Sequence, residues 1–577
     1  MIVHRRLPFL TPDIGCEHRS DGSVRLWSRT PLGEYPATVL DSLDHWAAAA
    51  PDRTALAERS GPGWRRLTFA ALRERARRVA QGLIERGLDP GRPVMILSGN
   101  SLDHAVLTIA GFYAGVPVCP VSPAYSLVSQ DFTKLRCIAK TVRPGLVWAE
   151  ESEPFADALA AVHPMPAQFD LTALEAEPME ELERRRRALD GGTVAKILFT
   201  SGSTGRPKGV TITHGMLAVN QRQLGLIWPF LEDRPPVLLD WLPWSHTFGG
   251  NQNLGLVLAR GATLYIDDGR PTPDAIARTV ENLRHVPLTL HFNVPRGLDM
   301  LLPYLEGDET LRDWFFAELD LIFYSGAALP QPLWRRMEAL GVAATGTRPV
   351  LTTAWGATET APLAMAAHFP LDRAGVVGVP VPGVEIALVP DGDKREIRVR
   401  GPNVAPGYMP ELSHSARAVD AEGFYRSGDA GSLADRSDPN AGVVFEGRIA
   451  EDFKLASGTW VSAGALRIAV VAACAPVVQD AVVTGHDRAN LGVLLFPYPG
   501  ARRIIEIVQA GLTRHNVRHP RSSTRITRAL VLEEPPRLDA DEITDKGYLN
   551  QRAILARRSD AVARLFSEPA GSGVIVL

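Results

Sequence analysis

The chain alternates between two spacings of its hydrophobic residues. After Thr68, apolar residues recur with helical spacing on one face, at Leu72, Ala76, Val79 and Leu83. Thr68 can cap the start of this helix, and Gly87 can end it. A continuous apolar run, VMIL at residues 94–97, comes next and is typical of a strand covered on both faces. This stretch therefore predicts a helix followed by a buried strand.

The same alternation continues along the chain and predicts an α/β fold. A second helix is expected over residues 104–115, and further strands are expected at residues 194–200, 237–242, 263–266 and 321–325. Repeated helices and apolar strands are typical of largely parallel sheets with helices on both faces. Within EIRVRG, Ile397 and Val399 alternate with charged residues, so sheets with one solvated face are expected to join there.

The chain is long enough for more than one domain. Its 577 residues exceed what one hydrophobic core usually supports. A polar, turn-rich stretch at residues 433–442 precedes a second mixed α/β pattern. We therefore expect a large N-terminal domain over residues 1–446 and a small α+β C-terminal domain over residues 447–577.

Composition and charge exclude several classes of protein. Hydrophobic residues make up 45%, and the net charge is −3, so no bulk attraction to nucleic acid or to an anionic membrane is expected. The arginine run at residues 183–190 lacks interleaved aromatics and is interpreted as a solvated helix face. No apolar stretch reaches the roughly 20 residues of a membrane span. The four cysteines are scattered, without a disulfide or zinc pattern, which favours a cytoplasmic protein.

A segment rich in glycine and hydroxyl residues follows the expected strand at residues 194–200. It reads TSGSTGRPKG, and the residues that carry its chemistry are Thr200, Ser201, Gly202, Ser203, Thr204, Gly205 and Lys208. Small residues let backbone N–H groups approach an anion, hydroxyls donate to phosphate oxygens, and lysine supplies positive charge. The Walker A pattern is not met, because Lys208 lies between Pro207 and Gly209. We predict a phosphate-binding loop; the alternative is a surface turn.

SGSTGRPKG resembles the signature of the adenylate-forming superfamily, which includes acyl-CoA synthetases, aryl-CoA ligases, peptide-synthetase adenylation domains and luciferases. Other segments resemble further motifs of that family, in the same order: WLPWSHTFGG (241–250), YSGAAL (324–329), WGATET (355–360), YRSGD (425–429) and FEGRIAEDFKLASGTWVS (445–462). The resemblance covers nearly the whole chain. It implies activation of a carboxylic acid with ATP, Mg²⁺ and CoA, a small β-barrel-like subdomain in the large domain, and a mobile C-terminal domain.

The resemblance also implies roles for single residues. In the nucleotide site, Gly326, Ala327 and Ala328 would stack on adenine, Thr358 would contact the α-phosphate, Glu359 would hold Mg²⁺, and Asp429 and Arg448 would bind the ribose. Trp355, Gly356 and Gly458 would complete the nucleotide and CoA contacts. The acyl pocket would be formed by His246, as its wall or gate, with Asn251, Asn293 and Tyr324. Taken alone, His246, Glu359 and Asp429 could instead be a structural histidine, a helix-start carboxylate and a turn cap.

The C-terminal segment departs from the family's pattern. Relatives carry a T-x-x-G-K-like segment whose lysine reaches the carboxylate and the α-phosphate, whereas residues 542–553 read EITDKGYLNQRA. Lys546 precedes the glycine, and alignment on that glycine would put Tyr548 in the lysine's position. Because the chemistry needs a cation, we predict Lys546 as the catalytic lysine.

Segments around residues 240–273, 447–466 and 542–553 are similar to the feruloyl-CoA synthetase subgroup. This similarity implies a hydroxycinnamic acid (ferulic, p-coumaric or caffeic) as substrate, activated to an acyl-adenylate and transferred to CoA in phenylpropanoid catabolism. The alternatives are a CoA ligase for a fatty or benzoic acid, a stand-alone adenylating enzyme that loads a carrier protein, and an inactive relative that only binds. Oligomeric state, including a homodimer, is left open.

Overall fold

The computed structural model describes residues 4–164, 167–201, 206–409 and 418–577. The predicted opening helix is present as α2 (Phe69–Glu85), and the Thr68 side chain accepts a hydrogen bond from the backbone N–H of Ala71. Strand β5 (Val94–Ile96) and helix α3 (Leu102–Ala114) follow, and Gly115 ends α3 in the left-handed conformation. The predicted helix–strand alternation is therefore confirmed in this part of the chain.

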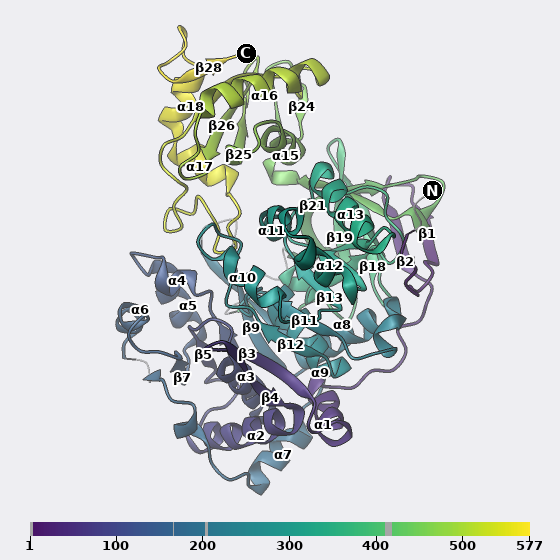
Figure 1. Ribbon diagram of the computed structural model, residues 1–577, viewed down its shortest axis with the longest axis vertical. Coiled ribbons are helices and arrows are strands. Elements are labelled where there is room, and N and C mark those ends of the chain that lie inside the picture. Colours follow the sequence, from purple (N-terminus) through teal and green to yellow (C-terminus); the bar gives the residue numbers. More distant parts are fainter. Residues whose placement is uncertain (1–3, 165–166, 202–205, 410–417) are drawn as a thin grey trace.

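A long mixed sheet forms the centre of the large domain (Figure 1). Its parallel strands lie in the order β3 (Thr54–Ser60), β12 (Thr263–Ile266), β11 (Val237–Asp240), β13 (Leu290–Asn293), β14 (Leu321–Tyr324) and β15 (Val350–Gly356). The carboxyl ends of parallel strands meet at one edge, where α/β proteins usually bind ligands. The segments after β11, β14 and β15 carry the candidates His246, Asn251, Gly326, Ala327, Ala328, Thr358 and Glu359.

The sheet continues on one side of β15 with antiparallel strands. These are β16 (Leu363–Ala366), β17 (Val376–Pro380), β22 (Val443–Arg448), β21 (Tyr425–Leu433), β19 (Lys394–Arg400), β18 (Glu385–Asp391), β2 (Val24–Ser28) and β1 (Ile14–His18). The small β-rich subdomain expected from the resemblance corresponds to this antiparallel part. At the other edge, β4 (Gly63–Thr68) pairs with β3.

A second sheet packs beside the first with helices between them. Its strand order is β20 (Tyr408–Met409), β10 (Pro207–Thr213), β9 (Val194–Ser201), β6 (Val118–Pro120), β5, β7 (Leu146–Trp148) and β8 (Ala167–Gln168). Helices α3 and α8 (His214–Ile227) are buried along most of their length, and their side chains join those of both sheets in one hydrophobic core. The expected phosphate loop connects β9 to β10, but Gly202, Ser203, Thr204 and Gly205 lie outside the described residues.

The C-terminal domain has its own sheet and core. Strands β25 (Val478–Thr484), β26 (Leu491–Pro497), β27 (Ile526–Val531) and β28 (Val574–Val576) are flanked by helices α15 (Ala463–Ala473), α16 (Ile504–Arg518), α17 (Gln551–Arg557) and α18 (Ser559–Leu565). The boundary expected between residues 446 and 447 falls within β22. In Figure 1 this domain forms the yellow-green lobe, and yellow loops below α17 extend toward the large domain. Within the described ranges, no helix combines the length and apolar character needed to cross a membrane.

Candidate active site

The turn after β15 places two candidate residues at the edge of the sheet. Thr358 and Glu359 lie in a short 3-10 helix (Thr358–Thr360), where they are 7% and 9% exposed. The Thr360 hydroxyl accepts a hydrogen bond from the Ala357 N–H at 2.8 Å, which closes the turn. The backbone carbonyl of Glu359 accepts a hydrogen bond from the Ala405 N–H at 2.8 Å. Glu359 is therefore held on a fixed backbone rather than on a free loop.

A tyrosine links Glu359 to the strand that carries Lys208. The Tyr408 hydroxyl donates to Oε1 of Glu359 at 2.7 Å, and Nζ of Lys208 lies 5.7 Å from the centre of the Tyr408 ring. Burial, reinforced by the nearby carboxylate of Glu359, raises the pKa of Tyr408, so this hydroxyl is a neutral donor. The structure thus brings together Lys208 and Glu359, which are far apart in sequence. Sequence reasoning missed Tyr408, because no local pattern marks a residue 49 positions from its partner.

Trp355, Asp429 and Arg448 meet where β15, β21 and β22 approach one another. The Trp355 indole N–H donates to Oδ2 of Asp429 at 3.0 Å, and Nε of Arg448 lies 3.5 Å from Oδ1. That Oδ1 atom is buried and accepts no hydrogen bond in the described part of the chain. Burial raises the pKa of Asp429, while Arg448 and Trp355 oppose that rise. A buried carboxylate oxygen without a donor is suited to accept a hydrogen bond from a ligand hydroxyl.

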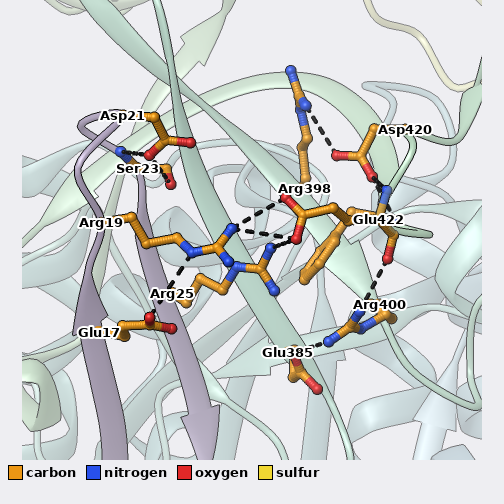
Figure 2. Close-up of polar contacts among 11 residues, drawn as sticks. Glu17, Arg19, Asp21, Ser23, Arg25, Glu385, Arg398, Arg400, Asp420 and Glu422 are labelled. Atoms are coloured by element: carbon orange, nitrogen blue, oxygen red, sulfur yellow. Dashed lines mark hydrogen bonds and ion pairs between the residues drawn. The ribbon is translucent and has the colours of Figure 1, made fainter.

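An ion-pair network fixes the loop that leads into Asp429 (Figure 2). Asp420 accepts hydrogen bonds from the Phe424 and Glu422 backbone N–H groups and from Nη1 of Arg398, at 2.9, 3.0 and 2.9 Å. Glu422 is held in turn by Arg25, from β2 at the other end of the chain. Figure 2 shows the β1–β2 hairpin directing its arginines toward Glu422, so the N-terminal hairpin supports the strand of Asp429.

His246 lies at the interface between the two domains. Its Nε2 atom is 2.7 Å from Oδ2 of Asp545, and the two side chains are 12% and 7% exposed. Burial, reinforced by the charge of Lys546, holds the pKa of His246 well below its usual range. A neutral ring with its proton on Nε2 therefore donates to the Asp545 carboxylate. The sequence identified His246 but gave no signal for its partner Asp545, which is 299 positions away.

Asn251 lies close to His246, in a π-helical turn that spans Phe248–Asn253. Its side-chain amide donates to the Thr247 hydroxyl at 2.9 Å. Beneath this turn, buried Lys196 donates from Nζ to the Gly250 carbonyl at 2.5 Å. Lys196 and Asn251 also line a small buried cavity together with Phe112. Lys196 was missed because it occupies a strand position where the pattern predicts an apolar residue.

The remaining acyl-pocket candidates lie at the ends of β13 and β14. Asn293 is 3% exposed, and its side chain contacts His291 and the Val294 backbone N–H. The Tyr324 ring packs edge-on against Trp334, among the helices that cover one face of the sheet. Phe323, the preceding residue, packs on the opposite side, against Trp228 and Phe248. The Tyr324 ring thus lies on the opposite face of the sheet from Phe323.

Several of the remaining candidates are at least partly exposed. Gly326 and Ala327 are exposed, and Gly326 has φ of +85°, a conformation that favours glycine. Gly356 is exposed as well, and a Cβ built on it would collide with the Pro362 carbonyl oxygen. Gly458 is exposed in the C-terminal domain. Ala328 and Thr200 are half-buried, and Ser201 ends β9.

The C-terminal domain reaches this site through residues 538–548, which we term the docking segment. Lys546 is exposed, whereas Tyr548 is half-buried. A Cβ built on Gly326 would lie 2.5 Å from the Tyr548 hydroxyl oxygen, so the tyrosine fills the space beside that glycine. Lys546 and Tyr548, the two candidates for the position of the catalytic lysine, therefore both belong to a segment that contacts the large domain.

Two models of known families match this chain. One, described as AMP-binding enzyme, matches residues 43–409, and the other, AMP-binding enzyme C-terminal domain, matches residues 454–570. The chain belongs to the AMP-binding enzyme family.

Curated relatives of this AMP-binding enzyme include two ligases. A 3-[(3aS,4S,7aS)-7a-methyl-1,5-dioxo-octahydro-1H-inden-4-yl]propanoyl:CoA ligase from Rhodococcus jostii is 27% identical over 435 residues, covering 70% of this chain and 79% of the relative. A feruloyl-CoA synthase from Amycolatopsis is 28% identical over 417 residues, covering 70% of this chain and 76% of the relative. The solved structure of O-succinylbenzoate coenzyme A synthetase from Bacillus subtilis, in complex with AMP, superimposes with a TM-score of 0.70 at 19% identity, covering 90% of this chain and 98% of that one. That likeness shows the fold: a large α/β domain with mixed sheets and a small C-terminal domain.

Proposed function

We propose that this AMP-binding enzyme activates a carboxylic acid with ATP and transfers the acyl group to CoA. The observation that carries the proposal is the meeting of Glu359, Lys208 and Asp429 around the carboxyl end of β15. The relatives named above act, by their names, as acid–CoA ligases or synthases, which supports CoA as the acceptor. We further propose a domain boundary between residues 446 and 447, about which the small domain turns between two half-reactions.

The chemistry requires charge neutralisation more than a protein nucleophile. Joining a carboxylate to the α-phosphorus of ATP brings two anions together, so positioning and positive charge lower the barrier. In the proposal, Lys208 supplies charge at the phosphates, Thr358 donates its hydroxyl to the α-phosphate, and Asp429 with Arg448 holds the ribose. Oδ1 of Asp429 accepts no hydrogen bond in the described part of the chain, which supports the ribose assignment, because it can accept one from a ribose hydroxyl.

Mg²⁺ fits this arrangement as a partner of the nucleotide. Among the described residues, no group of three or more His, Cys, Asp or Glu side chains is arranged to hold a metal by itself. Mg²⁺ in ATP-dependent sites is commonly held by one or two carboxylates, substrate phosphates and water. Glu359 would supply the carboxylate, and the ion would neutralise phosphate charge. Tyr408 would orient that carboxylate through its 2.7 Å hydrogen bond.

We propose a hydroxycinnamic acid, such as ferulic, p-coumaric or caffeic acid, as the substrate. The similarity of three sequence segments to feruloyl-CoA synthetases supports this choice, as does the 28% identity to a feruloyl-CoA synthase. His246, Asn251 and Asn293 would border the acid together with the strand end at residues 324–326.

A panel of acids tests the proposal. Purified protein is incubated with ATP, Mg²⁺ and CoA and with ferulic, p-coumaric, caffeic, benzoic, octanoic or palmitic acid, and AMP release and thioester absorbance are measured. We expect the hydroxycinnamic acids to give the highest rates and equal amounts of AMP and thioester. Faster turnover of a fatty or benzoic acid would overturn the substrate assignment. AMP-forming adenylation without any thioester would overturn CoA as the acceptor and favour carrier-protein loading.

A further inference from the structure

We infer that Tyr548 is the residue through which the C-terminal domain contacts the acyl-adenylate, in the position where a lysine was expected. The inference deepens the proposed function and rests on it. Three observations support it. The docking segment is anchored on the large domain, the Tyr548 hydroxyl lies beside Gly326, and that hydroxyl can donate a hydrogen bond.

The first half of the docking segment is anchored on the large domain by apolar and polar contacts. Leu538 is 9% exposed and joins a hydrophobic cluster of the large domain. Lys134 donates to the Leu538 carbonyl at 2.9 Å and pairs with Asp541 at 2.6 Å. Asp539 accepts hydrogen bonds from the Ser129 hydroxyl and the Gln130 N–H at 2.7 and 2.8 Å. Paired charges and a buried leucine make this a specific contact surface.

The second half forms a tight turn directed at the site. The Thr544 N–H donates to the Tyr548 carbonyl at 2.8 Å, and the Thr544 hydroxyl accepts from the Tyr548 N–H at 3.1 Å. Gly547, with φ of +81°, supplies the left-handed residue that the turn requires. Asp545 is fixed at the turn by its contact with His246. These bonds hold the backbone of Tyr548 in place in the turn.

The Tyr548 side chain fills the space beside Gly326, at the end of β14. The closeness of its hydroxyl to a Cβ position on Gly326 means that the phenol borders the strand end expected to hold adenine. Burial raises the pKa of Tyr548 to about 12, although Arg467 opposes the rise. The phenol is therefore protonated at neutral pH and can donate to an anionic oxygen. Lys546 lies two residues earlier and is exposed.

The test separates the two half-reactions in the full-length enzyme. Adenylation is followed by ATP–pyrophosphate exchange with the best acid of the panel, and thioester formation is followed from chemically made acyl-adenylate and CoA. We expect Tyr548→Phe to lower exchange by roughly 100- to 1,000-fold, the usual scale for loss of one preorganised donor. Thioester formation is expected to stay within about twofold of wild type, because it uses the other domain arrangement.

Tyr498→Phe is the matched control. Tyr498 is also a tyrosine of the C-terminal domain, and its hydroxyl accepts a hydrogen bond from Arg296, in helix α11 (Pro295–Gly307) of the large domain. Because Tyr498→Phe removes one contact between the domains, it should change the ratio of the two half-reactions less than Tyr548→Phe does. Lys546→Ala should also reduce exchange less than Tyr548→Phe does. An equal or larger loss in Lys546→Ala, or an equal loss of both half-reactions in Tyr548→Phe, would overturn the inference.

A binding measurement distinguishes this inference from the proposed function. With AMP as the calorimetric probe, Tyr548→Phe should weaken binding about two- to tenfold, as expected for one neutral hydrogen bond. If wild type shows no exchange with any acid, the proposed function fails whatever the variants do. If wild type is active but Tyr548→Phe matches it in both exchange and AMP binding, only the present inference fails.

Discussion

The buried amine of Lys196 should make the stability of the folded protein depend on pH. The side chain is 2% exposed, and burial lowers its pKa from 10.5 to about 7. Its amine is held by one carbonyl, that of Gly250, in the turn that carries Asn251. Between pH 7 and 10.5 the unfolded chain binds a proton that the folded chain lacks, so stability rises with pH over that window and is constant below it.

Replacing Lys196 by methionine should remove this rise. The wild-type free energy of unfolding should gain up to about 1.4 kcal/mol per pH unit from this residue between pH 7 and 10.5. Urea denaturation of wild type and Lys196→Met at pH 7, 8 and 9 measures the difference in slope. Lys140→Met, which changes an exposed lysine, should keep the wild-type slope. A Lys196→Met slope equal to that of wild type would show that the amine is charged in the folded protein.

Asp429 is the residue on which the ribose assignment depends. Asn in its place keeps the shape and can still accept from Trp355, but it lacks the charge that attracts Arg448 and two ligand hydroxyls. We predict that Asp429→Asn weakens AMP binding about tenfold, measured by calorimetry. Asp435→Asn, at the other end of the same strand region, is the control and should bind AMP like wild type. Unchanged binding in Asp429→Asn would remove this residue from the nucleotide site.

At the scale of elements, the antiparallel part of the large sheet joins the two ends of the large domain's sequence. β2 pairs with β18, and its Arg25 reaches Glu422 in the loop before β21 (Figure 2). Asp420 closes that loop. Although burial would raise it, the pKa of Asp420 is lowered by hydrogen bonds from the Phe424 N–H and Arg398. The Asp420 carboxylate is thus charged, and its hydrogen bonds hold the loop in place.

Asp420→Asn should therefore weaken the proposed nucleotide site indirectly, through the loop that leads to Asp429. The amide accepts fewer hydrogen bonds from Arg398 and the loop backbone, so the start of β21 should loosen. We expect AMP affinity to fall about two- to fivefold and amide exchange at residues 420–429 to quicken, as followed by mass spectrometry. Asp435→Asn serves again as the control, because Asp435 closes a similar exposed turn through Ser437. Faster exchange in both variants alike would show that the loop does not support Asp429 specifically.

At the scale of the whole molecule, one lysine ties the two domains together beside the expected boundary. Lys394, the first residue of β19, pairs with Asp452 and donates to the Glu446 carbonyl at 2.8 Å. It also donates to the Ser462 hydroxyl at 3.3 Å. The Asp452 side chain is 7% exposed, so removal of its partner would leave a buried charge.

Lys394→Met should free the small domain from this arrangement. We expect amide exchange in residues 446–462 to rise about 10- to 100-fold, and ATP–pyrophosphate exchange to fall more than thioester formation. Arg395→Met is the neighbouring control, because Arg395 contacts the Gly22 carbonyl instead. Equal amide exchange rates of residues 446–462 in the two variants would show that Lys394 does not hold the two domains together.

The sequence by itself determined the α/β class, the positions of the main strands and helices, and the identity of many residues at the strand ends. The spacing of hydrophobic residues follows from which side chains are buried, and the motifs are short continuous segments. Both can therefore be recognised in the sequence without a structure. Only the tertiary structure decided the partners: Tyr408 for Glu359, Asp545 for His246, Lys196 for Gly250 and Tyr548 for Gly326. Each of these contacts joins residues far apart in the chain, and which side chains meet there depends on how strands, turns and domains pack rather than on any local pattern.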